Sequence, residues 1–268
     1  MAAFEIKNLS FTYPGREEPA LSRVDFKLEY SEFVLLCGQT GCGKSTLLRN
    51  LKTALAPHGK REGEILFYGR PLSQVGPAEQ AARIGYVMQD PDTQIVTDKV
   101  WHELAFGLES LGLDQRTIRL RVAEMASFFG IQKWFGREIS KLSGGQKQVL
   151  NLASVMAMHP DVLILDEPTA QLDPIAAGDF LETVKKINRE IGTTVLMSEH
   201  RLEDVMSLAD RVVILDKGRK IVDGPPEAVG PALHQMDHPM LRAMPAPVQI
   251  CEALPSPGEE RCPITVRD

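Results

Sequence analysis

The chain has 268 residues, 43% hydrophobic and 25% charged, which is ordinary for a globular protein with a sizeable core. Its formal net charge of −6 argues against a broad nucleic-acid-binding surface. No apolar run reaches the roughly 18 residues of a membrane span, and MAAFEIKNLS lacks the pattern of a signal peptide, so we expect a cytoplasmic protein. The four cysteines form no C-x-x-C pair, which indicates neither a zinc site nor a disulfide framework.

The first part of the chain predicts strands. Apolar and polar residues alternate over 4–13 and again over 20–30, as in half-buried strands. EFVLLCG (32–38) is instead a continuous apolar run ended by glycine, which is typical of a strand covered on both faces. DVLILDE (161–167) and TTVLMSEH (193–200) repeat this pattern. Helical segments separate the three, so we predict an α/β core with a mostly parallel sheet.

Between about 90 and 160 the apolar spacing becomes helical, as in KVWHELAFGLESLG, so a helical subdomain is predicted within the sheet domain. RVVILDKGRKIVDG (211–224) predicts a hairpin that turns at Lys217-Gly218. Prolines are frequent after Gly230 and are expected to break any regular element. We therefore predict one domain over 1–230 and a proline-rich tail or linker over 231–268.

GQTGCGKST (38–46) fits the pattern G-x-x-x-x-G-K-[ST], placed between a buried strand and a helix. Backbone N–H groups of such a loop surround a triphosphate, the Lys44 ammonium reaches the outer phosphates, and the Ser45 hydroxyl is a ligand for Mg²⁺. The predicted ATP-binding residues are Gly38, Gln39, Thr40, Gly41, Cys42, Gly43, Lys44, Ser45 and Thr46.

Polar side chains end three other predicted strands. Asp166 is expected to bind Mg²⁺ directly or through water, and the Glu167 carboxylate to orient and deprotonate an attacking water. His200 could bond a γ-phosphate oxygen or that water, although a lone histidine is usually structural. Gln89 could touch the metal, and Tyr13 could stack on adenine, although a tyrosine of a surface turn accounts for Tyr13 equally well.

KLSGGQKQVL (141–150) begins a helix. Ser143 and Gln146 stand in the relation of a capping box, and Gly144 and Gly145 leave bare N–H groups in the first turn. Because donors at the positive end of a helix suit an anion, this tip is a candidate phosphate site, with an ordinary capped helix as the alternative.

Together these residues resemble the ATP-binding cassette (ABC) ATPases over about 1–230. Tyr13 stands as the adenine platform, 38–46 as the phosphate loop, Gln89 in the lid loop, and Leu142, Ser143, Gly144, Gly145 and Gln146 as the signature. LILDE, AQLD with Asp173 in the dimer loop, and the switch histidine His200 complete the match. The resemblance implies a P-loop NTPase (RecA-like) core with an N-terminal antiparallel β subdomain and an inserted helical subdomain. It also implies that ATP and Mg²⁺ are bound between two cassettes, where one signature contacts the γ-phosphate held by the other.

A transporter subunit is the leading interpretation, and a soluble ABC ATPase acting on ribosomes or DNA is the alternative. The segment 89–110 is similar to energy-coupling-factor (ECF) ATPases, which drive uptake of vitamins and of cobalt or nickel ions. The resemblance implies a second cassette, alike or different, a transmembrane scaffold, a substrate-binding membrane subunit, and a position on the inner face of the cell membrane. No nucleic acid is expected as a partner. The tail also permits the hypothesis that the chain is half of a two-cassette polypeptide. The expected contacts with a membrane partner are Asp90, Asp92, Gln94, Ile95, Val96 and Trp101, with an ordinary amphipathic lead-in to a helix as the alternative.

Overall fold

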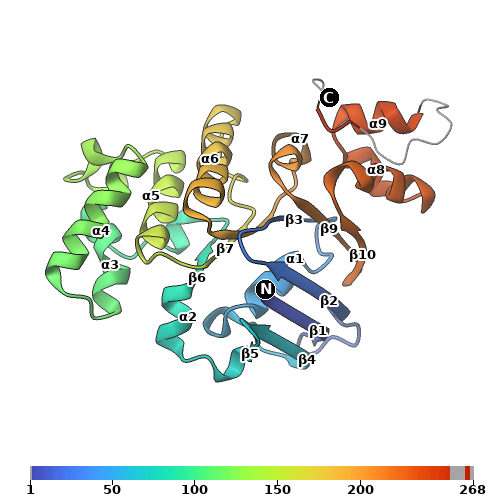
Figure 1. Cartoon of the computed structure of the whole chain (residues 1–268), viewed down its shortest axis with the longest axis horizontal. Helices are drawn as coiled ribbons and strands as arrows, with labels where there is room; N and C mark the ends of the chain where they lie inside the picture. The colour runs from blue at the N-terminus through green and yellow to red at the C-terminus, as the bar shows by residue number, and fades with distance from the viewer. Residues whose placement is uncertain (1, 254–262, 266–268) are drawn as a thin grey trace. The chain divides into compact units, whose positions relative to one another are not determined.

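The computed structural model describes residues 2–253 and 263–265. The chain divides into two compact units. Figure 1 labels their helices and strands. The first unit comprises Met1–Gln74 and Thr194–Asp268, and the second comprises Val75–Thr193.

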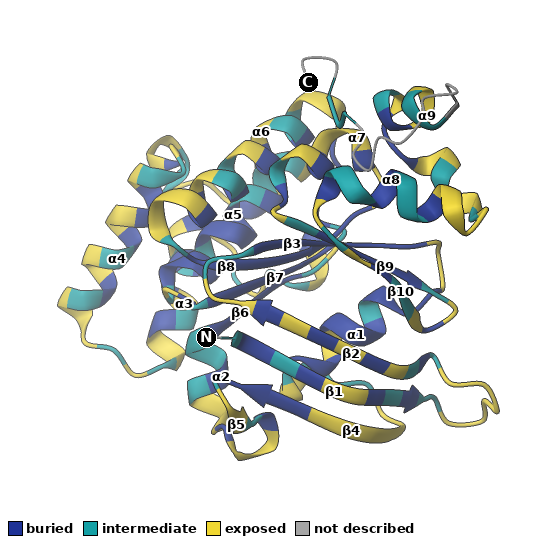
Figure 2. Ribbon diagram, turned by 45° about the vertical axis from the view of Figure 1, so that its right-hand side comes forward, coloured by how far each residue is buried: buried dark blue, intermediate teal, exposed yellow. Residues whose placement is uncertain are grey.

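An antiparallel sheet occupies the start of the first unit, in the order β2-β1-β4-β5. Its strands are β1 (Ala2–Thr12), β2 (Leu21–Glu29), β4 (Lys60–Phe67) and β5 (Arg70–Pro71). Ile6 of β1 faces Phe26 of β2 and Ile65 of β4, and all three side chains are buried. Dark and yellow segments alternate along β1 and β2 in Figure 2. The two predicted half-buried strands are therefore confirmed, with their apolar residues on one face.

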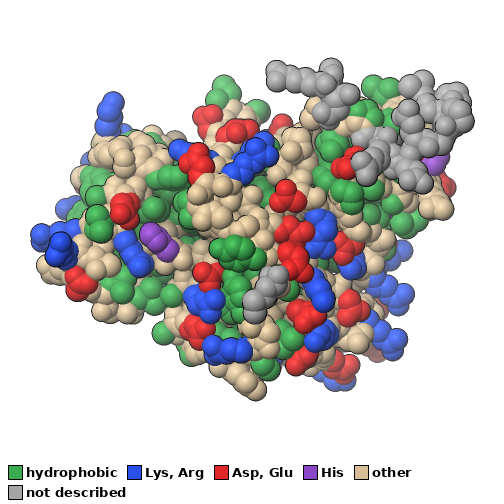
Figure 3. All heavy atoms as spheres, in the orientation of Figure 1, with side chains coloured by type: hydrophobic (Ala, Val, Ile, Leu, Met, Phe, Trp, Pro, Cys, Tyr) green, Lys and Arg blue, Asp and Glu red, His purple; other side chains and the backbone are tan. Residues whose placement is uncertain are grey.

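Lysine and glutamate side chains of this sheet pair with each other. Lys27 Nζ lies 2.8 Å from a Glu5 carboxylate oxygen, and Lys60 Nζ lies 2.7 Å from Glu62. Red and blue side chains are interspersed over this part of the molecule in Figure 3. The exposed face of the sheet is thus a surface of paired charges without one dominant sign.

The other sheet portion of this unit has the order β10-β9-β3-β8, in which β9, β3 and β8 are parallel and β10 runs antiparallel to β9. The strands are β3 (Phe33–Cys37), β8 (Thr194–Ser198), β9 (Arg211–Asp216) and β10 (Arg219–Gly224). Every residue of β3 and β8 is buried, as continuous apolar runs predict. Lys217 and Gly218 both have positive φ (44° and 74°) at the hairpin turn between β9 and β10, so the predicted turn is confirmed.

Short helices lie in both stretches of this unit, up to Gln74 and after Thr194. They are α1 (Lys44–Asn50), the 3-10 helices η1 (Thr53–Leu55) and η2 (Leu72–Gln74), α7 (Leu202–Val205) and η7 (Met206–Leu208). Helix α1 follows β3 directly after the glycine loop, in the strand–loop–helix order that the sequence predicted.

Three helical segments follow β10: α8 (Pro226–Gln235), η8 (Pro239–Ala243) and α9 (Ala246–Ala253). The expectation that prolines break every regular element after Gly230 is therefore wrong. Proline is tolerated in a first helical turn because that turn needs no N–H donor, and Pro239 occupies such a position. The last part of the predicted tail or linker, 254–262 and 266–268, lies outside the described residues. Cys251 is disulfide-bonded, which the cysteine spacing did not indicate.

The second unit contains two parallel strands, β6 (Ile84–Val87) and β7 (Val162–Asp166). Between them lie three long helices, α3 (Val100–Ser110), α4 (Gln115–Phe128) and α5 (Gly144–Ala157), where helical segments were predicted. The remaining elements are α2 (Pro77–Arg83), η3 (Pro91–Thr93), η4 (Gln132–Trp134), η5 (Ile139–Lys141), α6 (Pro174–Lys186) and η6 (Ile187–Ile191). Leu104 and Leu108 of α3 and Leu150 and Leu152 of α5 are fully buried in the core of this unit. Among the described residues, no helix is both long and apolar enough to cross a membrane.

Candidate functional site

Two strands of the first unit bring predicted site residues to the same edge of the sheet. β3 and β8 are parallel neighbours, with Leu36 opposite Ser198. The phosphate loop begins directly after β3, and His200 follows directly after β8. Because carboxyl ends of parallel strands meet at the same edge, the structure brings the loop and His200 to one end of the sheet. His200 is exposed there, and its N–H lies 3.2 Å from the Glu199 carboxylate.

The phosphate loop needs its glycines. Gly38, Gly41 and Gly43 all have positive φ (150°, 82° and 110°). An added Cβ at Gly43 would lie 2.6 Å from the Ala20 carbonyl oxygen, whereas a Cβ at Gly41 would meet nothing within 4 Å. The Lys44 ammonium donates to the Gly38 carbonyl at 2.9 Å and is 4% exposed. The loop is therefore closely packed at Gly43 and open at Gly41, and the Lys44 cation is bound to its backbone. A glycine loop with such a cation is the donor set that a triphosphate requires.

Replacing Gly38 with Ala tests this packing. The new Cβ would overlap the Leu215 carbonyl oxygen and lie 2.5 Å from Cys42 Sγ. We expect Gly38→Ala to lower the free energy of unfolding, measured by urea titration, by about 3 kcal/mol. The matched change Gly41→Ala adds a Cβ in open space and should cost only about 1 kcal/mol of backbone strain. Equal losses for the two variants would contradict the packing described here.

Tyr13 lies against this loop. Its hydroxyl is 3.0 Å from the Thr46 hydroxyl, and its ring packs edge-on against Phe11 with centroids 4.9 Å apart. The ring is half-buried, so one part of it remains accessible.

Burial raises the pKa of the Cys42 thiol, which keeps this loop cysteine protonated and unreactive.

The second unit also brings predicted site residues to one edge of its strands. β6 and β7 are parallel, with Val87 opposite Leu165, so Gln89 and the pair Asp166 and Glu167 leave the sheet at the same end. Gln89 is exposed, whereas Asp166 is 5% exposed and accepts a hydrogen bond of 3.1 Å from the Tyr86 hydroxyl.

Glu167 is half-buried and has a φ of 50°, a left-handed conformation that a residue with a side chain rarely adopts. Strain of this kind persists where the surroundings fix the backbone, and it concentrates at functional sites. The sequence held no signal for this strain, nor for the contact between Tyr86 and Asp166.

The predicted signature forms the N-terminus of α5. Ser143 Oγ accepts from the Gln146 N–H at 3.3 Å, and Gln146 Oε1 accepts from the Ser143 N–H at 3.0 Å, so the predicted capping box is confirmed. Leu142 is buried below it, while Ser143 and Gly144 are exposed. A Cβ at Gly144 would meet nothing within 4 Å. Asp173 caps the next helix, α6, and accepts from the Ile175 and Ala176 N–H groups at 3.1 and 2.9 Å.

The segment expected to contact a membrane partner is only partly outward-facing. Asp92 is exposed but forms an ion pair of 2.6 Å with Lys147 of α5. Asp90 caps η3 and accepts from the Asp92 N–H at 3.0 Å. The Gln94 amide closes the loop, because it accepts from the Met88 N–H and donates to the Tyr86 carbonyl, both at 2.9 Å. Three of the expected contacts thus already have intramolecular partners.

The apolar part of this segment is accessible. Val96 is 62% exposed and Trp101 is 40% exposed, while Ile95 is half-buried. Phe106, one further turn along α3, is 46% exposed and was missed in the sequence. Glu103, also missed, is buried and accepts from the Val96 and Thr97 N–H groups at 3.2 and 2.9 Å, which fixes the loop ahead of α3.

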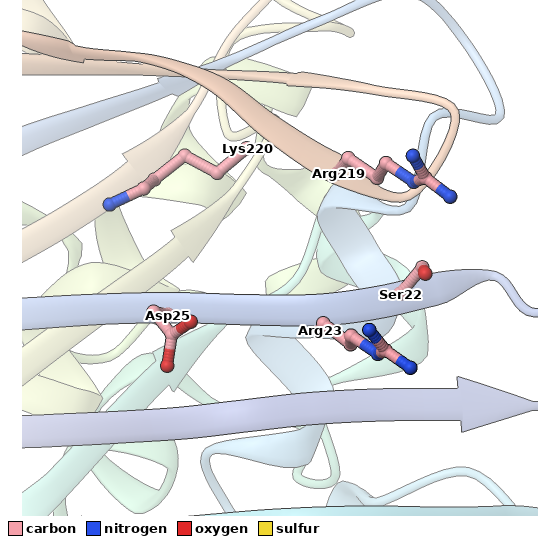
Figure 4. Close-up of a pocket in the computed structure, with 5 residues that line it drawn as sticks. All are labelled: Ser22, Arg23, Asp25, Arg219 and Lys220. Carbon is pink, nitrogen blue, oxygen red and sulfur yellow. The ribbon is translucent and has the colours of Figure 1, made fainter.

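Two further features bear on ligands. Among residues 2–253 and 263–265, no group of three or more His, Cys, Asp or Glu side chains could hold a metal ion by itself. A shallow pocket between β2 and β10 contains none of the predicted site residues (Figure 4). It is lined by Ser22, Arg23, Asp25, Arg219 and Lys220.

The fold and these two sheet edges define a nucleotide-binding α/β protein of the P-loop type. The model of the ABC transporter family matches residues 21–170. A Bacillus anthracis protein described as a candidate ABC transporter ATP-binding protein is 48% identical over 229 residues, which is 85% of this chain. A counterpart from Methanosarcina acetivorans is 42% identical over 93% of this chain. The chain therefore belongs to the ABC transporter family of ATP-binding proteins.

Solved structures are similar as well. CbiO1 from Clostridium perfringens, part of the ABC transporter complex CbiONQ, matches with a TM-score of 0.76 and 31% identity, covering 84% of this chain and 89% of its own. The dimeric cassette MJ0796 bound to ADP and Pi matches with a TM-score of 0.72 over 83% of this chain and 98% of its own, and at 24% identity it supports the fold alone. The chain spans 42% of the Bacillus anthracis relative and 39% of the Methanosarcina one.

Proposed function

We propose that this chain is the ATP-hydrolysing subunit of an ABC importer of the ECF type, acting on the inner face of the cell membrane. ATP-driven closure of two cassettes would power uptake of a vitamin or transition-metal ion through membrane subunits. The observation that carries this proposal is the likeness to CbiO1, together with the exposed apolar side chains that lead into α3.

ATP would be held by the phosphate loop, 38–46, with the adenine stacked on the accessible face of Tyr13. The Lys44 ammonium would exchange its carbonyl partners for phosphate oxygens. Ser45, Gln89 and Asp166 would hold Mg²⁺ together with the phosphates, because hydroxyl, amide and carboxylate oxygens are the hard ligands that this ion prefers. Mg²⁺, when bound, neutralises the charge that develops on the phosphates.

Hydrolysis would depend on carboxylate chemistry at the end of β7. Glu167 would take a proton from the attacking water, while His200 would bond a γ-phosphate oxygen or that water. Gln89, exposed at the end of β6, would order water and metal ligands at the same place.

Two cassettes would share each ATP. The signature Leu142–Gln146, exposed at Ser143 and Gly144, would bind the γ-phosphate held by the other cassette, and Asp173 would lie at the interface between them. MJ0796, whose cassette is similar in fold, is itself dimeric. The curated relatives are more than twice as long as the matched segment, so they have room for a second cassette of this size.

The test is to isolate the chain from detergent-solubilised membranes and identify what co-purifies. We expect an integral membrane protein, and we expect Trp101→Glu to abolish its recovery while leaving ATP hydrolysis by the isolated chain unchanged. Leu120→Glu, at another exposed apolar position of the second unit, should keep the membrane partner. Recovery of ribosomes or DNA in place of a membrane protein would overturn the transport role and favour the soluble alternative.

A further inference from the structure

Gln148 makes two hydrogen bonds that join functional loops. It lies on α5 and is 1% exposed. Its amide nitrogen Nε2 lies 3.2 Å from the Met88 carbonyl oxygen and 3.0 Å from the Pro168 carbonyl oxygen. Met88 directly precedes Gln89, and Pro168 directly follows Glu167. One side chain of the signature helix thus holds the backbone beside two of the proposed catalytic side chains, Gln89 and Glu167.

The orientation of this amide is fixed by its partners. Two carbonyl oxygens can only accept, so the NH₂ group must face both of them, and both of its hydrogens are used. The Gln148 oxygen Oε1 is consequently buried without a hydrogen-bond partner among the described residues. A buried acceptor left unsatisfied destabilises the fold. A methionine of similar length would avoid that cost, but it would leave the Met88 and Pro168 carbonyl oxygens without these two hydrogen bonds.

Two other polar contacts join α5 to the lid loop, the segment that contains Gln89 and the residues just after it. They differ from the bonds of Gln148 in one respect. Lys147 pairs with Asp92, and Asn151 Nδ2 donates to the Pro91 carbonyl at 3.3 Å. Both bonds hold the lid loop beyond Gln89, and neither reaches the loop of Glu167. Asn151 also has a buried oxygen, Oδ1, without a partner, which makes it a close match for Gln148 in burial and chemistry.

We propose that Gln148 is a positioning residue that fixes Gln89 and Glu167 relative to each other and to the signature helix. Its bond beside Glu167 also holds the backbone where that residue adopts its left-handed φ of 50°. A displacement of α5 on binding of a phosphate would then reach both side chains through one amide. This inference rests on the proposed ATPase function.

The test compares Gln148→Met with Asn151→Leu in the full chain. Loss of both donors should lower kcat for ATP hydrolysis about 10- to 100-fold, because small misplacements of reacting groups have effects of that size. KM for ATP should stay within about threefold, since the phosphate loop is untouched. Asn151→Leu should lose similar thermal stability yet keep kcat within about threefold. Amide hydrogen exchange should accelerate at 88–90 and 167–170 in Gln148→Met, but not at 167–170 in Asn151→Leu.

Two results would overturn the inference. One is a kcat for Gln148→Met that equals that of the unmodified chain. The other is unchanged exchange at 167–170 in Gln148→Met, whatever the activity. The exchange measurement also separates the two proposals. If the unmodified chain had no ATPase activity, the proposed function would be contradicted. The exchange pattern would still report on whether Gln148 holds the two loops.

Discussion

Glu167→Gln should lower ATP hydrolysis at least about 100-fold while ATP binding persists, because the amide cannot accept the proton of the attacking water. The substitution preserves size, and Glu167 is half-buried at the end of β7, so the fold should be retained. With hydrolysis blocked, the nucleotide that holds two cassettes together is not consumed. The variant should therefore accumulate as a dimer in Mg-ATP, which size-exclusion chromatography with light scattering would detect.

Glu182→Gln is the control for this experiment. Glu182 is an exposed carboxylate on α6 of the same unit, and its replacement should leave both hydrolysis and oligomeric state unchanged. A Glu167→Gln chain that hydrolyses ATP normally would remove Glu167 from the chemistry. A chain that stays monomeric at saturating Mg-ATP would contradict the shared site.

Gly144→Asp should abolish hydrolysis without weakening the fold. The new side chain meets nothing within 4 Å, and a carboxylate in the first turn of α5 interacts favourably with the helix dipole by about 0.3–1 kcal/mol. The same charge would repel a phosphate from the other cassette. We expect at least about a 100-fold loss of hydrolysis, because this repulsion would keep the phosphate away from the N–H donors of the tip, and losing even one such preorganised donor has effects of this size. Binding of ATP to the variant's own phosphate loop should be unchanged.

Gly136→Asp is the matched control, because Gly136 is exposed in the same unit and a Cβ there also meets nothing within 4 Å. It should leave the ATPase rate unchanged. Normal activity in Gly144→Asp, with Gly136→Asp also normal, would mean that the tip of α5 binds no phosphate.

The sequence predicted those parts of the fold and site that depend on local patterns. Continuous apolar runs identified β3, β7 and β8, and the spacing of Ser143 and Gln146 identified the start of α5. The prediction for the proline-rich segment was wrong because it treated prolines as breakers everywhere, although a first helical turn accepts them, as at Pro239, and α8 also contains Pro231 in its interior.

Contacts between distant parts of the chain could not be predicted in this way. The ion pair of Asp92 with Lys147 joins residues 55 positions apart, and the bond from Tyr86 to Asp166 spans 80 positions. The left-handed φ of Glu167 likewise depends on its surroundings rather than on its residue type. One consequence is that Asp92, which was expected to contact a membrane partner, already forms an ion pair with Lys147 of the same chain.

The proposition that the α5 tip acts on a neighbouring molecule can be tested most directly by cross-linking two separately prepared chains. One carries Thr40→Cys in the phosphate loop and the other Lys141→Cys beside the signature, both in the Glu167→Gln background with Cys251 and Cys262 replaced by Ser. Cys37 and Cys42 are buried, and burial raises the pKa of both thiols, so neither should react. With a short bis-maleimide, we predict a two-chain product that requires Mg-ATP and disappears when Gly144→Asp is added. A mixture that yields only single chains at saturating Mg-ATP would contradict the account.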